Sequence, residues 1–209
     1  MRKRKYTPLS NDDYVHITDD DGTPVALIHN IVATTQVWSN ILPINLQHIA
    51  DVLPNSYYDR QRFAAITIRI QNPTCTALLF TSGKLVLTGC RGWMECILAS
   101  LHIVQMLRRY NPHVEFMVID NTIQNIVAHV CTPLAQGTKL DLDAMYQAHG
   151  VQCTYQPQLF PGLIYRPDNS PIVLICFYSG NIVVTGGKCT ADIEQGWRKL
   201  WPLVRQFIL

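Results

Sequence analysis

The chain has 209 residues, of which 48% are apolar and 15% charged, with a formal net charge of +2. A chain of this length can bury a core as one domain or as two small ones. A net charge this small does not by itself indicate nucleic-acid binding. If the chain binds nucleic acid, its basic residues must gather on one face. Apolar runs such as Ile172–Phe177 are far too short to span a bilayer, and we expect no membrane association.

The seven cysteines include no CxxC pair and no His/Cys cluster at metal-ligand spacing. We therefore expect reduced, mostly buried thiols in an intracellular protein, and no metal or other cofactor. Residues 1–24 are expected to form an N-terminal arm. Its first residues, Met1–Lys5, are basic, and we interpret them as a solvated terminus, the alternatives being a nuclear signal or a phosphate contact.

From residue 25 onward the predicted elements occur twice in the same order. In the first copy we expect a strand, a short helix, three strands joined by tight turns, and a long helix: Val25–Thr35, Asn45–Leu53, Arg62–Ile70, Cys75–Thr81, Lys84–Thr88 and Gly92–Arg109. In the second copy the same series reads Val114–Cys131, Asp141–His149, Gly162–Arg166, Ile172–Tyr178, Asn181–Thr185 and Thr190–Phe207. Ser82-Gly83 and Ser179-Gly180 are two-residue hairpin signals, in which Gly supplies the positive φ of a primed turn.

Short motifs show that this is a true internal repeat. Three of them recur in order: Asn30–Val32 as Asn125–Val127, Phe80–Gly83 as Phe177–Gly180, and Val86–Gly89 as Val183–Gly186. The offsets are 125 − 30 = 95, 177 − 80 = 97 and 183 − 86 = 97 residues. We therefore predict one repeat over residues 25–112 and a second over residues 113–209.

The strands alternate with period two, which predicts one face packed on helices and one open face. In Arg62–Ile70 the alternation assigns Ala64, Ile66, Ile68 and Ile70 to the helix side, and Phe63, Ala65, Thr67 and Arg69 to the other. The next two strands add Thr76, Leu78, Phe80, Lys84, Val86 and Thr88 to that second surface. An exposed apolar strip rimmed by Arg and Lys is typical of a binding surface.

The two long helices differ in character. Thr190–Phe207 has one apolar stripe, Ile193, Trp197, Leu200, Val204 and Phe207, and contains Pro202, which we expect to kink it. Gly92–Arg109 is apolar almost all round, more so than one core can bury.

Four stretches resemble the core domain of the TATA-binding protein family, and the resemblance runs from about Leu27 to Phe207. They are Gln61–Arg69, Thr76–Lys84, Gln158–Arg166 and Pro171–Gly186. The resemblance implies an α+β fold in which two pseudo-symmetric repeats form a curved antiparallel β-sheet saddle, with helices on the convex face and DNA on the concave face. This family is itself the type case of minor-groove binding with inserted wedges and of a DNA bend near 80°.

The resemblance also implies roles for particular residues. Asn30 and Asn125, with Thr88 and Thr185 beside them, would donate to the N3 and O2 acceptors of A·T pairs. The apolar contacts to sugars and base edges would come from Val32, Leu78, Val86, Val127 and Val183. The wedges that unstack a base step at each end of the site would be Phe63 with Phe80 and Phe160 with Phe177. Phosphate contacts would come from Arg62, Arg69, Lys84 and Arg166.

The sequence departs from the family pattern in three places. Asn181 stands where Lys84 stands in the first repeat, and Pro167–Ser170 replaces a basic turn, so we expect weaker phosphate contact in the second repeat. Gln156 and Gln158, before Leu159, stand where the family has acidic residues that dock transcription factor IIB. The long helix from Gly92, with Trp93 and Met94, lacks the basic surface that meets factor IIA, which favours a dedicated convex-face partner or a homodimer.

The leading hypothesis is a general transcription initiation factor that binds A/T-rich, TATA-like double-stranded promoter DNA, bends it and nucleates an initiation complex with IIB-like and other factors. Its place would be the nucleus, or a cytoplasmic viral factory if the source is a large DNA virus. The alternative is a protein-interaction module that has lost specific DNA binding and competes for transcription factors. We do not expect an enzyme, because the seven histidines are scattered and have no recognisable partner carboxylates.

Overall fold

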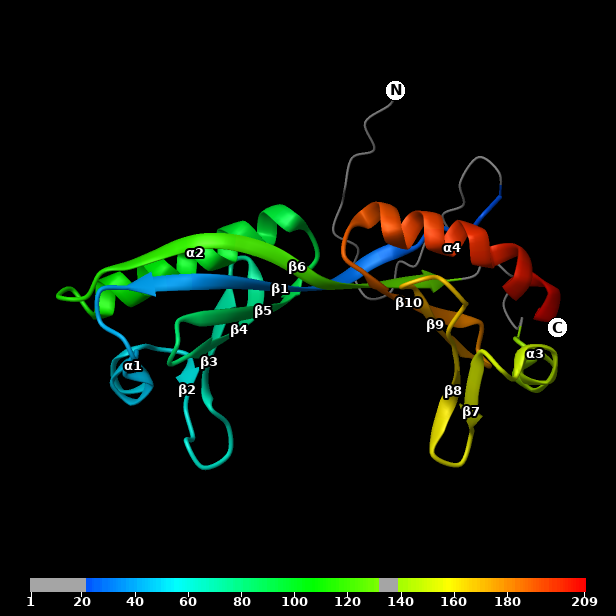
Figure 1. Cartoon of the computed structure of the whole chain (residues 1–209), viewed down its shortest axis with the longest axis horizontal. Coiled ribbons are helices and arrows are strands. Elements are labelled where there is room, and N and C mark those ends of the chain that lie inside the picture. The colour runs from blue at the N-terminus through cyan, green and yellow to red at the C-terminus, as the bar shows by residue number, and fades with distance from the viewer. Residues whose placement is uncertain (1–21, 132–138) are drawn as a thin grey trace, which may run out of the picture. The chain divides into compact units, whose positions relative to one another are not determined.

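The structure is a computed structural model that describes residues 22–131 and 139–209. The first series of elements is β1 Leu27–Ser39, α1 Leu46–Val52, β2 Ser56–Tyr57, β3 Ala65–Gln71, β4 Thr74–Phe80, β5 Lys84–Cys90 and α2 Trp93–Tyr110 (Figure 1). The second is β6 Phe116–Cys131, α3 Leu142–His149, β7 Cys153–Gln156, β8 Phe160–Tyr165, β9 Val173–Phe177, β10 Asn181–Gly187, α4 Thr190–Val204 and the 3₁₀ turn η1 Arg205–Phe207. The basic arm Met1–Lys5 lies outside the described residues.

The strands form one sheet in the order β2-β3-β4-β5-β1-β6-β10-β9-β8-β7, and the hairpins on both sides of it pair antiparallel. This confirms the predicted α+β class and the doubled series of elements. Spatial contacts divide the chain into two compact units. Unit 2 holds Ile28–Ala128 and Thr185–Ile193, and unit 1 holds His129–Val184 and Glu194–Leu209 with the described residues up to Leu27. Each unit is described by itself.

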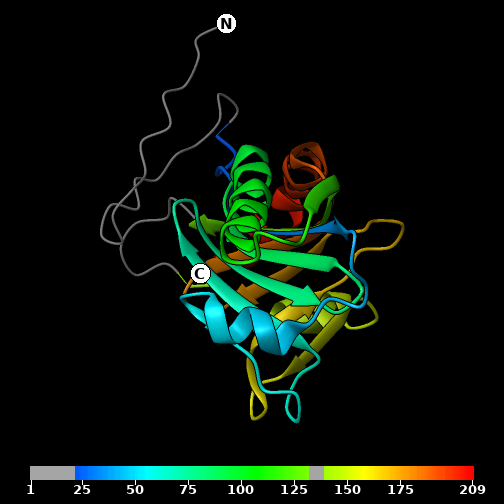
Figure 2. The same ribbon diagram turned by 90° about the vertical axis from the view of Figure 1, so that its left-hand side faces the viewer.

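In unit 2, α2 lies against one face of the strands (Figure 2). Its buried side chains, among them Ile103 and Leu107, meet the buried side chains of β3 to β5, such as Ile66 and Leu87, all with no measurable exposure. Removing this apolar area from water is the main source of the unit's stability, at about 25 cal/mol per Å². The helix α1 begins at Asn45, whose side chain accepts from the His48 amide at 3.0 Å, as expected for an N-cap.

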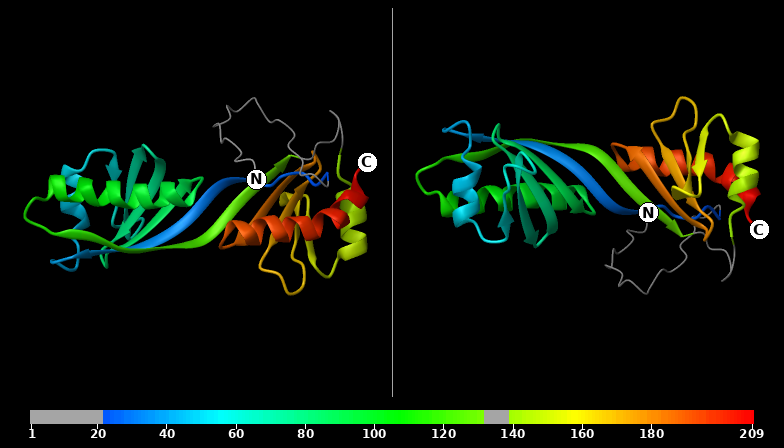
Figure 3. Two further views of the ribbon diagram at one scale, coloured as in Figure 1. Left: turned by 90° about the horizontal axis from the view of Figure 1, so that it is seen from above. Right: turned by 90° about the horizontal axis from the view of Figure 1, so that it is seen from below.

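In unit 1, α4 lies along one face of strands β8 to β10 (Figure 3). The contact is close: a Cβ at Gly196 would lie 2.4 Å from Cγ1 of Ile172, the residue before β9, so a larger residue here would push the helix and Ile172 apart. The Trp197 indole donates to the Pro24 carbonyl at 2.6 Å. The N-cap of α3 repeats that of α1, since Asp141 accepts from the Ala144 amide at 2.9 Å.

Several predicted boundaries were wrong. β3 begins at Ala65, because the amides of Arg62 and Phe63 both donate to the Asp59 carbonyl in a turn. Ala64, predicted to pack on the helices, is therefore exposed, and Ala65, predicted on the open side, is buried at 2% exposure. At the C-terminus the α-helix ends at Val204, two residues after Pro202, and continues as the turn η1.

Two short strands, β2 and β7, were not predicted at all. Two and four residues are too few to show a period, and each strand pairs with the outermost strand of its hairpin. Within the described residues no helix is both long and apolar enough to cross a membrane. The division into repeats at residue 112 stays a prediction.

Candidate nucleic-acid interface

The open face of unit 2, the face of its strands opposite α2, presents its side chains in ordered rows. Strand pairing places five residues of five strands in one row: Tyr57, Thr67, Leu78, Val86 and Thr34. Tyr57 is exposed, and the other four residues are half-buried. The sequence predicted Leu78 and Val86 on this face, and their opposition across β4 and β5 shows that they share it.

Each unit has a pair of phenylalanines in edge-to-face contact; Phe80, Phe160 and Phe177 lie on strands, and Phe63 lies just before β3. The ring centroids of Phe63 and Phe80 lie 6.1 Å apart in unit 2, and those of Phe160 and Phe177 lie 5.9 Å apart in unit 1. Phe63 is 49% exposed and Phe160 41%. Both pairs thus combine one half-buried ring with one ring that water reaches, which is costly for an apolar side chain unless a partner covers it.

The second pair rests on a glycine. A Cβ at Gly162 would lie 2.7 Å from Phe160 Cε1, 2.9 Å from Ile175 Cγ2 and 3.1 Å from Phe177 Cε1. The rings therefore occupy the space above the Gly162 backbone. At the matching position of the first repeat, 162 − 97 = 65, the residue is Ala65, which pairs with Phe80.

The two asparagines predicted at the centre of the site have the same local geometry. Asn30 Oδ1 accepts from the Gly89 amide at 2.7 Å and from the Thr88 hydroxyl at 3.3 Å. Asn125 Oδ1 accepts from the Gly186 amide at 3.0 Å and from the Thr185 hydroxyl at 3.2 Å. All of these residues belong to unit 2.

The glycine after each threonine explains this geometry. Gly89 has φ +102° and Gly186 has φ +98°, a conformation that side chains disfavour. Around Gly89 the pairing of β1 with β5 shifts register, and the extra residue makes a bulge that aims an amide at the asparagine. Because the backbone N–H donates to Oδ1, the orientation of each side-chain amide is fixed and Nδ2 is left as the donor. Asn125 Nδ2 donates one hydrogen bond to Thr185 Oγ1 at 3.0 Å.

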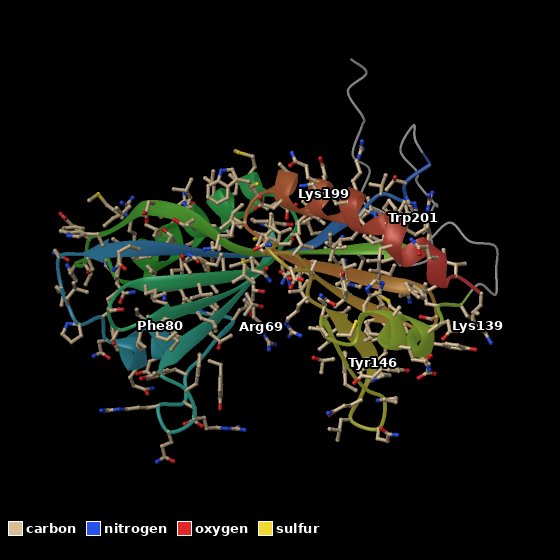
Figure 4. The ribbon with its side chains drawn as sticks, turned by 45° about the vertical axis from the view of Figure 1, so that its right-hand side comes forward. Arg69, Phe80, Lys139, Tyr146, Lys199 and Trp201 are labelled. Carbon is tan, nitrogen blue, oxygen red and sulfur yellow. The ribbon has the colours of Figure 1, made fainter. Side chains whose placement is uncertain are left out.

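The cations predicted to meet phosphate stand in different settings. Arg69 on β3 and Lys84 on β5 are exposed, as are Arg62 in the turn before β3 and Arg166 just after β8. Figure 4 labels Arg69 and Phe80 on the strands of unit 2, on the side opposite α2. Asn181, which replaces a cation in the second repeat, is exposed at the start of β10.

Val32, Val127 and Val183 are half-buried in the strands predicted for them. Sequence reasoning missed Ile175, which faces Ile164 across β8 and β9 and touches the space above Gly162. Its position is 78 + 97 = 175, so the repeat offset that pairs Phe80 with Phe177 would have found it as the counterpart of Leu78.

The residues predicted to meet protein partners are exposed. Gln156, Gln158 and Leu159 lie at the β7–β8 turn, where Leu159 is 82% exposed. On α2, Trp93 is 39% and Met94 63% exposed, and Leu98 and Leu101 continue the apolar stripe. This confirms the prediction that α2 is too apolar for one core to bury, because part of its apolar surface stays exposed.

Three buried thiols, Cys75, Cys90 and Cys96, lie together in unit 2. Hydrogen bonding to Cys90, together with burial, raises the pKa of both Cys75 and Cys96, which keeps these thiols protonated. In the part of the chain that the structure describes, no group of three or more His, Cys, Asp or Glu side chains is arranged to hold a metal ion.

Comparison of the sequence with known proteins gives consistent matches to one family. The family model described as "Transcription factor TFIID (or TATA-binding protein, TBP)" matches residues 26–110 and 120–207. The chain is 37% identical over 183 residues to the TATA-box-binding protein of Candida albicans, covering 88% of this chain and 73% of that one. It is 37% identical over 182 residues to TATA box-binding protein-like 2 of Takifugu rubripes, covering 86% of this chain but only 53% of the relative.

A solved structure agrees with the sequence matches. Methanococcus jannaschii TBP aligns with a TM-score of 0.70 at 29% identity, covering 88% of this chain and 99% of that chain. The repeated strand, helix and hairpin series, with its match to a solved structure of this fold, places the chain in the class of two-repeat, sheet-based transcription factors. The chain belongs to the TATA-binding protein family of transcription factors.

Proposed function

We propose that this chain is a general transcription initiation factor that binds A/T-rich, TATA-like promoter DNA in the minor groove, bends it and nucleates an initiation complex. The observation that carries the proposal is the duplicated Asn–Thr–Gly geometry, in which each glycine amide donates to the asparagine oxygen. The amide nitrogen keeps hydrogens to donate, of which Asn125 shares one with Thr185. Paired donors beside apolar side chains match the minor groove of A·T pairs, which shows only acceptors.

The same geometry would reject G·C pairs. Guanine places an amino group in the minor groove, where it would meet the Nδ2 donors of Asn30 and Asn125 and the methyl groups of Val32 and Val86. Neither partner could accept its hydrogen bond, and an unmade bond to a buried donor costs about 1–3 kcal/mol.

The phenylalanine pairs supply the bend in this proposal. Phe63 and Phe160 are each close to half exposed. If either ring were inserted between two base pairs, those base pairs would cover its exposed surface. Unstacking costs a few kcal/mol per step, which the added contact of a bent duplex offsets. TA steps deform most easily, so the wedges would add sequence preference without hydrogen bonds.

The test is a mobility-shift titration of the chain on a TATA duplex and on a G/C duplex of equal length. It is combined with energy transfer between dyes at the two duplex ends. We expect selective binding to the TATA duplex and higher energy transfer on binding. Equal affinity for both duplexes, or a complex without a change in end-to-end distance, would contradict the proposal.

A second candidate is a protein-interaction module that has lost specific DNA binding. It is favoured by Asn181 in place of a cation, by the net charge of +2 and by the exposed apolar stripe of α2. In the titration above it would bind neither duplex selectively. Both candidates are non-enzymatic.

The partners follow from the leading proposal. They would be double-stranded promoter DNA, a IIB-like factor and other initiation factors, with a dedicated partner or a second copy of the chain over α2. The place of action would be the nucleus, or a cytoplasmic viral factory for a chain of viral origin.

A further inference from the structure

The helix α2 has a row of side chains on the side that faces away from the strands. The row consists of Met94, Leu98, Leu101 and Gln105, at steps of 98 − 94 = 4, 101 − 98 = 3 and 105 − 101 = 4 residues. Met94 is 63% exposed, Leu98 52% and Leu101 48%, and Gln105 is exposed as well. Exposures of this size mean that, within the described residues, no other element covers the row. We call these four residues the outer row of α2.

The spacing of the outer row indicates the kind of partner that fits it. Alternating steps of four and three residues are those by which one α-helix packs along another. They keep the row on one side of the helix, because they average close to the 3.6 residues of a helical turn. Leaving Leu and Met side chains in water is unfavourable, and a second helix with a similar row would cover them. The outer row therefore fits an α-helix.

The charges beside the outer row indicate which helix fits. Glu95, His102 and Arg109 follow one flank of the row, at steps of 102 − 95 = 7 and 109 − 102 = 7 residues. Glu95 lies in the first turn of α2 and Arg109 in the last. A second α2 that runs antiparallel to the first would place Arg109 of each copy near Glu95 of the other, whereas a parallel copy would bring like charges together.

The outer row is also complementary to itself in the antiparallel direction. If Leu98 of one copy faces Leu101 of the other, the two residue numbers add to 98 + 101 = 199, and Met94 then faces Gln105 at the same sum, 94 + 105 = 199. All four residues of each copy thus meet a partner, with the leucines at the centre and the glutamines at the ends. Each copy uses the same surface, as a closed two-fold dimer requires.

We propose that α2 binds α2 of a second copy of the chain, antiparallel and through the outer row, to form a homodimer. Because α2 lies on one face of the strands of unit 2, the pair leaves the opposite, open face of each copy uncovered (Figure 2). The contact extends over only about 16 Å of helix, so we expect a dissociation constant on the order of micromolar. This self-association requires no DNA, and its failure would leave the proposed function untouched.

The first test reads the direction of the pair by crosslinking. In a Cys189→Ser background, which removes an exposed native thiol, Met94→Cys and Gln105→Cys are made as two proteins with tags of different size. On mild oxidation their mixture should form a disulfide-linked dimer of both proteins. Neither protein alone should exceed the background, because like positions lie 105 − 94 = 11 residues apart in the antiparallel pair, about 16 Å. Crosslinking of each protein with itself, but not in the mixture, would overturn the proposal.

The second test exchanges the charges, with sedimentation equilibrium as the measurement. Glu95→Arg alone and Arg109→Glu alone should each weaken self-association about tenfold, because each places like charges together twice in the dimer. An equimolar mixture of the two should associate as tightly as the wild type, which a variant that had lost its fold could not do. Asp143→Arg makes the same charge change in the first turn of α3 and is the matched control, expected to associate as the wild type.

Two results of the second test would overturn the proposal. One is a wild type that stays monomeric at about 100 μM, well above the expected dissociation constant. The other is a wild-type dimer that neither charge reversal weakens, since its interface would then lie elsewhere on the chain.

Discussion

Asparagines 30 and 125 show how single side chains are prepared for contact, because a backbone amide from a bulge holds each oxygen in place. We predict that Asn125→Asp essentially abolishes TATA binding. The carboxylate can still accept from the Gly186 amide, so the fold should survive, but it presents a negative charge to base acceptors and phosphates. The measurement is a mobility-shift titration with thermal unfolding as the control. A uniform loss on TATA and G/C duplexes with selectivity preserved would count against the assignment.

Gly162 allows a second residue-scale prediction. A methyl group there would lie 2.7 Å from Phe160 and 3.1 Å from Phe177, so Gly162→Ala should displace the ring pair and reduce DNA bending. Gly92→Ala is the matched control, because a Cβ at Gly92 meets nothing within 4 Å. Energy transfer between duplex ends should fall for Gly162→Ala only. An equal bend in both variants would show that this pair does not act as a wedge.

Cys176 gives a pH-dependent prediction. Burial raises the pKa of this thiol from 9.0 to about 12. The unfolded chain therefore ionises first, so the stability contribution is fully present below pH 9 and is lost as the pH rises toward 12. Cys176→Ala should reduce the free energy of unfolding at pH 7 by about 1 kcal/mol or more and flatten its decline above pH 9. Urea titrations at pH 7 to 11 measure both, and an unchanged decline would refute the assignment to this thiol.

At the scale of elements, the helices and the strands of the hairpins could be predicted, and the two shortest strands, β2 and β7, could not. The helices α2 and α4 and the strands β4 and β5 fall within two residues of their predicted starts, because many residues report one period. The start of β3 could not be predicted, because Arg62 and Phe63 continue the alternating pattern of the strand. In the structure their amides donate to the Asp59 carbonyl in a turn instead. Only its pairing with β3 makes β2 a strand.

The apolar stripe of α2 supports an element-scale prediction. Met94 and Leu98 are 63% and 52% exposed on the helix that covers the face opposite the open strands. Met94→Lys/Leu98→Lys should therefore leave TATA affinity within about twofold of the wild type, because exposed substitutions away from a site cost at most about 0.5 kcal/mol. Sedimentation velocity of the wild type and of the double variant tests the homodimer. If α2 forms the dimer interface, the wild type should sediment with the mass of a dimer and the variant with the mass of a monomer. A large loss of TATA affinity would place α2 in the DNA site.

At the scale of the whole molecule, the internal repeat made both the fold class and most candidate residues predictable, because two copies of a motif specify one position twice. Asn30 with Asn125 and Phe80 with Phe177 were found in this way. The hydrogen bond from Gln152 to Asp168 could not be predicted, because the first repeat has Asn55 and Gln71 at these positions. The effect of a difference between the two repeats depends on the side chains that surround it in space, and the sequence alone does not give these.

The β7–β8 turn is where such a departure bears on the assembly of an initiation complex. Gln156 and Gln158 are exposed there beside Leu159, and both stand where the family resemblance implies acidic residues that dock factor IIB. Charges at the rim of an interface govern encounter rate and partner choice, and glutamines keep the hydrogen bonds without the charge.

We therefore predict weak recruitment of a conventional factor IIB by the wild type on TATA DNA, and several-fold stronger recruitment by Gln156→Glu/Gln158→Glu. Pull-down of the ternary complex measures the difference, and the binary affinity for DNA serves as the control. That affinity should fall slightly or stay equal, since the two added carboxylates can only repel phosphate. Strong ternary assembly by the wild type, unchanged when the charges are introduced, would mean that the glutamines have no part in choosing the partner.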